Sequence, residues 1–189
     1  MWNAPGSESG KRLGSWGIPD ILSAMAREIS AGGVVLRQIC GVWHVALIEP
    51  QKEDSKPAPK PAKTPRERRR AVLALPKGLV DAGEKAQAAA IREVQEETGI
   101  VAEPVTKLCD NKYVYVRTWG DGARVFKIVS FYLMRYVSGE IDILTSDMRI
   151  EVKRALWVPL ADAARQLAYS NERKVLRQAR EYVETRGLE

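Results

Sequence analysis

The chain has 189 residues and a mass of 21.1 kDa, a length typical of one domain with additional segments. Hydrophobic residues make up 45% and charged residues 29%, which excludes a wholly disordered chain. No apolar run approaches the roughly 18 residues that a membrane-spanning helix requires, so no membrane partner is expected. With only two cysteines, a disulfide-stapled secreted fold is excluded and a cytoplasmic location is expected.

Most of the net charge of +6 lies in one segment. Residues 51–70 hold eight basic residues, three acidic residues and four prolines, and so contribute +5. This composition is typical of a solvated insertion, although a basic cluster also attracts polyanions. The chain has a single histidine, His44, which excludes a His-rich metal site.

The predicted elements alternate irregularly along the chain. Residues 1–28 are expected to form a tail with a short helix over residues 19–29, and residues 29–189 the main domain. Strands are predicted at residues 31–39, 42–49, 101–108, 113–118, 125–136 and 155–158. Helices are predicted at residues 84–97, 160–168 and 171–185, the first ended by Gly99. This order indicates an α/β fold whose sheet is covered by helices on both sides.

The predicted helix at residues 84–97 carries an arc of acids. At about 100° per residue, Glu93, Glu96 and Glu97 share an arc of roughly 100°, opposite a weakly apolar stripe around Ile91. Like charges at these spacings destabilise an isolated helix by roughly 0.2–0.5 kcal/mol per pair. A divalent cation would neutralise them, and oxygen ligands without histidine or cysteine favour Mg²⁺, with Mn²⁺ as the alternative. A solvated helix face is the competing interpretation.

The spacing around these acids favours the metal site. From Gly78 the chain reads GLVDAGEKAQAAAIREVQEETGI, which matches G-x5-E-x7-R-E-U-x-E-E-x-G-U, with U aliphatic, at every fixed position. This resembles the Nudix box, and the chain is identified as a member of the Nudix hydrolase family, with a MutT-like character. The box covers 23 residues, and the flanking elements extend the resemblance loosely over residues 29–184.

The resemblance implies an α/β/α sandwich with a mixed sheet, and Mg²⁺-dependent hydrolysis of a nucleoside diphosphate linked to another group. The residues at the family's metal-binding positions are Gly78, Glu84, Glu93, Glu96 and Glu97. Arg92 is expected to pair with Glu84 and to orient the helix. Glu93 is one candidate for the general base, and Glu151 from a separate loop is the other, with Glu140 as a second choice in that region.

Two further segments bear on the substrate. Residues 75–78 read LPKG, which resembles dinucleoside-polyphosphate hydrolases and their bacterial relatives, and Lys77 is expected to contact substrate phosphate. Residues 127–133 (KIVSFYL) resemble a strand of the diadenosine-tetraphosphate hydrolases, with phenylalanine in place of the family's tyrosine. Alternation places Lys127 and Phe131 on one face, as a phosphate contact and a stacking surface for a base. A core aromatic beside an edge lysine is the plain alternative.

The sequence therefore predicts a small-molecule nucleotide or polyphosphate substrate, with dinucleoside polyphosphates such as diadenosine tetraphosphate first. Oxidised nucleoside triphosphates and diphosphoinositol polyphosphates are the alternatives within the enzyme class. A non-catalytic nucleotide sensor or RNA-binding protein of the same fold is the alternative of another class, and the complete acidic set argues against it. No nucleic-acid-binding module is recognised, so nucleic acid is not an expected partner. Both a monomer and a homodimer are compatible with the sequence.

Overall fold

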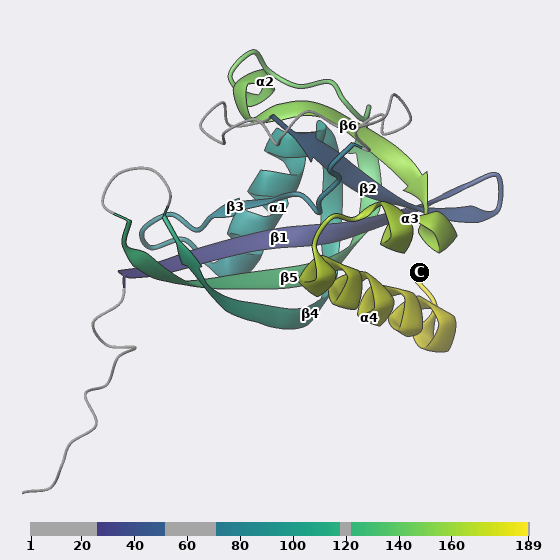
Figure 1. The fold of residues 1–189 in the computed structure, drawn as a ribbon. Coiled ribbons are helices and arrows are strands. Elements are labelled where there is room, and N and C mark those ends of the chain that lie inside the picture. Colours follow the sequence, from purple (N-terminus) through teal and green to yellow (C-terminus); the bar gives the residue numbers. More distant parts are fainter. Residues whose placement is uncertain (1–25, 52–70, 118–121, 189) are drawn as a thin grey trace, which may run out of the picture.

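The computed structural model describes residues 26–51, 71–117 and 122–188, which form a six-stranded sheet with helices on both faces (Figure 1). The strands are β1 (Ala26–Ile39), β2 (Val42–Pro50), β3 (Lys77–Leu79), β4 (Ile100–Val116), β5 (Arg124–Gly139) and β6 (Val152–Pro159). The helices are α1 (Ala86–Thr98), α2 (Met148–Glu151), α3 (Leu160–Gln166) and α4 (Ser170–Arg186). Residues 1–25 and 52–70, which cover most of the predicted tail and insertion, lie outside this description.

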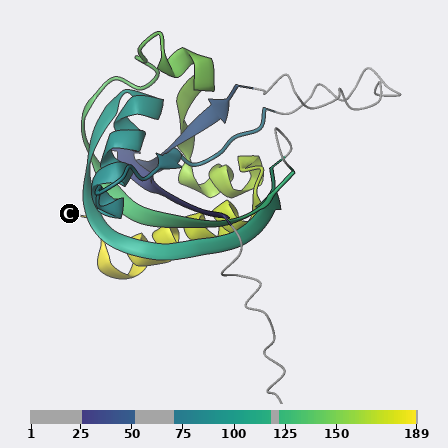
Figure 2. The same cartoon turned by 90° about the vertical axis from the view of Figure 1, so that its left-hand side faces the viewer.

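The sheet is mixed and separates the two larger of three hydrophobic clusters. Its strands follow the order β4-β5-β1-β2-β6, with β3 paired to β1 beside this path, and only β1 and β5 run parallel among the described pairs. Along β1, Val34 and Leu36 join the core under α3 and α4, whereas Ala31 and Val35 join the core under α1. Figure 2 shows the curved β4–β5 pair passing between α1 and α4. The predicted α/β/α sandwich is confirmed.

Helix α1 lies very close to β1 because a glycine stands beneath it. A Cβ atom at Gly33 would lie 2.6 Å from Val94 Cγ2 and 2.9 Å from Met134 Sδ. We expect Gly33→Ala to lower the free energy of unfolding by roughly 1–3 kcal/mol, because overpacking forces these neighbours to shift. Denaturant titration measures this effect, and an unchanged midpoint would show that α1 tolerates a wider separation from the sheet.

The predicted helix over residues 19–29 is wrong where the structure describes it. Residues 26–29 belong to β1 and pair in parallel register with β5, from Ala26 opposite Val125 to Ile29 opposite Ile128. Ile29, which the helical pattern placed on an apolar face, is 51% exposed. The predicted domain boundary at residue 29 therefore falls inside a strand, because pairing with a distant strand outweighs a short local pattern.

The predicted strands at residues 101–108 and 113–118 are joined into one strand, β4, which ends at Val116. The residues between them, 109–112, stay paired with β5. Asp110 lies opposite Ser130, whose hydroxyl donates a hydrogen bond of 2.6 Å to the Asp110 carboxylate. The pairing of β4 with β5 shifts register at residues 101/102, 104/106 and 107/109, and β4 continues through these irregularities.

The remaining predicted elements agree with the structure to within a few residues, whereas the short elements β3 and α2 were not predicted. Helix α1 begins two residues later than predicted and ends at Gly99, whose φ of 79° is the left-handed conformation that glycine adopts readily. Helices α3 and α4 occupy the two predicted C-terminal helices. In the described part of the chain, no helix has the length and apolar character needed to cross a membrane.

Candidate active site

The acids of α1 lie on or beside the helix face that packs on the sheet, and not opposite it as predicted. Ile91, the centre of the predicted apolar stripe, is only half-buried. The buried residues of α1 are Ala89, Ala90, Val94, Glu97 and Thr98. Glu97 is therefore buried in the interface between α1 and the sheet, on the same helix face as the small residues Ala89 and Ala90. Glu93 and Glu97 thus lie against the strand β3, whereas Glu96 stays 39% exposed.

Glu97 is the most deeply buried acid of α1. Its side chain is 7% exposed, and its Oε2 atom accepts a hydrogen bond of 2.5 Å from the backbone N–H of Lys77, the first residue of β3. Burial raises the pKa of Glu97 to about 8; the negative charges of Glu93 and Glu151 act in the same direction, and the positive charge of Lys77 acts against it. A carboxylate in this position is costly to ionise unless a further positive charge is nearby.

Arg92 holds three acids together from one side. Its guanidinium donates two hydrogen bonds to Glu84, at 3.1 and 2.9 Å, so the predicted pair is present. It also donates to Glu93 at 2.7 Å, to Glu96 at 2.9 Å and to the Leu79 carbonyl at 2.9 Å. These acids raise the pKa of Arg92 further, so its charge is permanent. Arg92 thereby ties α1 to the loop between β3 and the helix.

Gly78 and Glu93 lie against one another. A Cβ atom at Gly78 would lie only 2.0 Å from Glu93 Oε2 and 2.3 Å from Glu93 Oε1. The glycine of the motif therefore leaves space that the carboxylate fills.

We expect Gly78→Ala to lower turnover roughly tenfold or more, because the added methyl group displaces the Glu93 carboxylate and small misplacements of reacting groups are costly. Initial rates on a nucleotide substrate measure this effect, with circular dichroism to verify folding. Unchanged turnover of a folded variant would show that Glu93 need not lie against Gly78.

Glu151 approaches this cluster from a different element. It is the last residue of α2, and its charge raises the pKa of both Glu93 and Glu97. The structure thus brings the predicted loop acid within electrostatic reach of Glu93 and Glu97, although it lies 58 and 54 residues beyond them in the sequence. Glu140 is exposed in the segment that follows β5.

The donor set fits a hard divalent cation. Three acids, Glu84, Glu93 and Glu96, share the single positive charge of Arg92. Burial, together with neighbouring acids, raises the pKa of Glu93 and Glu97, so a nearby cation would favour their ionised forms. Both carboxylates border β3, one at Lys77 and one at Gly78, and oxygen donors of this kind suit Mg²⁺. Among the described residues, no three acidic, histidine or cysteine side chains converge as a preformed metal site. Arg92 takes one carboxylate oxygen from each of Glu93 and Glu96, Oε1 and Oε2 respectively.

The side chain of Lys77 is held by the protein. Its Nζ atom lies 3.4 Å from Glu172 Oε1 and 3.5 Å from the Leu75 carbonyl. Sequence reasoning did not single out Glu172, which lies in α4 and is 2% exposed. Glu172 is far from Lys77 in the sequence, so no local pattern predicts their contact. The one sequence feature that could have identified Glu172 is its position on the apolar face of an amphipathic helix.

The predicted stacking surface is not formed. Alternation does place Val129, Phe131 and Leu133 on one face of β5, as expected. Phe131, however, is 1% exposed in the core under α4, so the structure corrects its assignment as a stacking residue. Lys127, on the same strand, forms an ion pair with Glu28 of β1, and its role as a phosphate contact stays a prediction.

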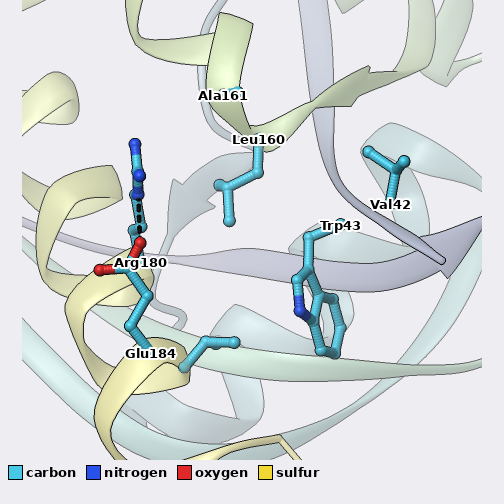
Figure 3. A pocket seen from close by; sticks show the side chains of 7 residues that line it. Val42, Trp43, Leu160, Ala161, Arg180 and Glu184 are labelled. Atoms are coloured by element: carbon cyan, nitrogen blue, oxygen red, sulfur yellow. Dashed lines mark hydrogen bonds and ion pairs between the residues drawn. The ribbon is translucent and has the colours of Figure 1, made fainter.

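A cavity of about 280 Å³ lies apart from this site, between the start of β2, helix α3 and helix α4 (Figure 3). Its lining residues are Val42, Trp43, Leu160, Ala161, Arg180, Val183 and Glu184. None of the predicted site residues belongs to this lining, so the cavity is not part of the candidate active site.

The sequence model of the NUDIX domain matches residues 56–179, which include the complete acidic motif. The chain belongs to the Nudix family. The chain is 38% identical over 157 residues to the putative mutator protein MutT4 of Mycobacterium tuberculosis, covering 83% of this chain and 56% of that protein. It is 36% identical over 103 residues to an 8-oxo-(d)GTP phosphatase of Mycolicibacterium smegmatis, covering 54% of this chain and 28% of that protein. The chain thus spans about half the length of the first relative and less of the second.

Solved Nudix structures share the fold of this chain. A Caenorhabditis elegans Ap4A hydrolase in a binary complex has a TM-score of 0.57 and 24% identity, over 83% of this chain and 98% of that one. The NUDIX domain of Shewanella oneidensis NrtR complexed with ADP ribose has a TM-score of 0.60 and 18% identity, over 87% of this chain and 93% of that one. At these identities the likeness confirms the Nudix fold.

Proposed function

We propose that this chain is a Mg²⁺-dependent Nudix hydrolase that cleaves a pyrophosphate bond in a nucleotide. The observation that carries this proposal is the burial of Glu97 against β3, with Glu93 beside it at Gly78, in a chain whose Nudix box is complete. Buried carboxylates are retained at a cost to stability unless they are paired or hold a cation. A non-catalytic sensor of the same fold has no need to retain this whole set.

The proposed roles divide the motif residues between metal binding, orientation of the acids and proton transfer. A bound divalent cation supplies charge neutralisation on the pyrophosphate oxygens and lowers the pKa of a water molecule. We assign its binding to Gly78, Glu93, Glu96 and Glu97. Arg92, oriented by Glu84, holds Glu93 and Glu96 in place through one oxygen of each. The attacking water gives its proton to a carboxylate. Glu93 and Glu151 are the two candidates for this carboxylate, because the charges of both act on the buried Glu97.

Oxidised nucleoside triphosphates are the first substrate candidates. The support comes from the 38% and 36% identity to a putative mutator protein and to an 8-oxo-(d)GTP phosphatase. Dinucleoside polyphosphates are the second candidates, supported by the LPKG sequence at residues 75–78. The burial of Phe131 removes one of the two features of β5 that had placed them first.

A panel of substrates tests this proposal. The purified chain would be incubated with Mg²⁺ and 8-oxo-dGTP, dGTP, diadenosine tetraphosphate, ADP-ribose or a diphosphoinositol polyphosphate, in ¹⁸O-labelled water. Mass spectrometry of the products identifies both the substrate and the phosphorus that is attacked. We expect the oxidised triphosphate to be turned over fastest. Binding of a nucleotide without turnover of any would support the sensor instead.

A further inference from the structure

The segment that leads into the active site, residues 73–78, is fixed by the strands on either side of it. The Ile48 N–H donates to the Ala74 carbonyl at 3.0 Å, and the Ala74 N–H donates to the Ile48 carbonyl at 2.9 Å. The Gly33 N–H donates to the Pro76 carbonyl at 3.1 Å. These bonds to β2 and β1 set the path of the backbone toward Gly78.

The next two backbone N–H groups of this segment bind carboxylates instead of strands. The Leu75 N–H donates to Glu172 Oε2 at 2.9 Å, and the Lys77 N–H donates to Glu97 Oε2 at 2.5 Å. Pro76, between them, has no N–H to donate. One carboxylate comes from α4 and the other from α1, so the segment is held between helices on opposite faces of the sheet.

Glu172 makes a second contact with the same segment. Its other oxygen, Oε1, lies 3.4 Å from the Nζ atom of Lys77, and its side chain is 2% exposed. Its neighbours on the buried face of α4 are the apolar residues Val175, Leu176 and Ala179. Apolar residues of similar volume in place of both Glu172 and Lys77 would avoid the cost of burying this charged pair, whereas loss of Glu172 alone would remove a partner from the Leu75 N–H and from the Lys77 ammonium. The carboxylate therefore requires an explanation beyond the stability of the core.

We propose that Glu172 is a positioning residue of the active site, which acts through residues 75–77 to hold Gly78 against Glu93 and the Lys77 amide against Glu97. The inference rests on the proposed function. It assigns a role in catalysis to a residue of α4 that lies 72 or more positions beyond the Nudix box in the sequence. Lys77 is part of this tie, since its backbone binds one carboxylate and its ammonium the other.

Two conservative variants test the proposal. Glu172→Asp keeps the charge but shortens the side chain, so it cannot reach Leu75 and Lys77 together. Glu172→Gln keeps the length and an acceptor for the Leu75 N–H but loses the charge that faces Lys77. Substitution of a residue that supports metal ligands typically lowers metal affinity or activity by about 10–100-fold. We therefore expect Glu172→Asp to weaken Mn²⁺ binding and to lower kcat about tenfold or more. Glu172→Gln should lie about threefold below the unmodified chain, and KM should change little in both variants.

Val175→Ala, three residues along the same buried face, is the matched control. It should lower the melting temperature without changing Mn²⁺ affinity, measured by electron paramagnetic resonance, or kcat. If both Glu172 variants lower only the melting temperature, as this control does, Glu172 is structural and the proposal is wrong. If Glu172→Asp does not fold, unchanged Mn²⁺ affinity and kcat of Glu172→Gln would overturn the proposal alone. Mn²⁺ affinity needs no substrate, so weakened binding in a chain that hydrolyses nothing would refute the proposed function but not this inference.

Discussion

Glu97→Gln is expected to lower turnover by roughly two or more orders of magnitude, because it removes a charge that acts at the transition state. The substitution keeps the size of the side chain and an acceptor for the Lys77 N–H, so the local packing is retained. Steady-state kinetics with saturating Mg²⁺ measure the effect. Glu103→Gln is the control, since Glu103 is an exposed acid of β4 whose partner is Arg135 at 2.9 Å. Turnover of Glu97→Gln within a few-fold of the unmodified chain would refute the metal-site assignment.

The same substitution should not destabilise the metal-free protein. The pKa of Glu97 is about 8 in the folded state, against an ordinary value of 4.5, because its side chain is buried. The folded state therefore binds this proton more tightly than the unfolded chain, and the contribution of Glu97 to the free energy of unfolding falls as the pH rises between these two values. We expect the chain to lose stability between about pH 5 and pH 8 in the presence of a chelator, and Glu97→Gln to lose less. Equal losses in denaturant titrations would contradict the burial of a charged Glu97.

The local part of the site could be predicted from the sequence. The spacing of Gly78, Glu84 and Arg92 with the three later acids identified the family, and the Arg92–Glu84 pair is present in the structure. These contacts lie within one loop and one helix, where sequence separation fixes geometry. The face of α1 was wrong because the helical wheel was centred on Ile91, whereas the buried face holds the small residues Ala89 and Ala90 together with Val94 and Glu97.

The long-range part of the site could not be predicted. Glu172 and Leu75 are 97 residues apart, and no periodicity indicates that α4 would reach the segment before the box. Alternation along β5 correctly placed Lys127 and Phe131 on one face, but it could not show that α4 covers that face at Phe131. The parallel pairing of β1 with β5 likewise has no signal in the local sequence. This pairing extends β1 over residues 26–29, which were expected to be helical.

Arg92→Ala should have the second large effect, a loss of turnover of about 100-fold, since it removes the group that orients the acids. The guanidinium makes five hydrogen bonds to four residues, and the replacement leaves Glu84, Glu93 and Glu96 without this counter-charge. The metal-free variant should therefore melt at a lower temperature than the unmodified chain. Mg²⁺ should restore more of the melting temperature in this variant, because the cation replaces the missing positive charge.

Arg92→Lys separates the charge of Arg92 from its geometry. A lysine keeps the charge but cannot place donors on Glu84, Glu93 and the Leu79 carbonyl at the same time, because its ammonium lacks the planar fork of the guanidinium. We expect turnover to fall about tenfold, while the melting temperature falls less than in Arg92→Ala. Arg180→Ala, which breaks an exposed pair with Glu184 on α4, is the control and should change neither quantity. Full activity of Arg92→Lys would show that the acids need only a nearby positive charge, and that the loop between β3 and α1 is positioned by Glu97 and Gly78 without Arg92.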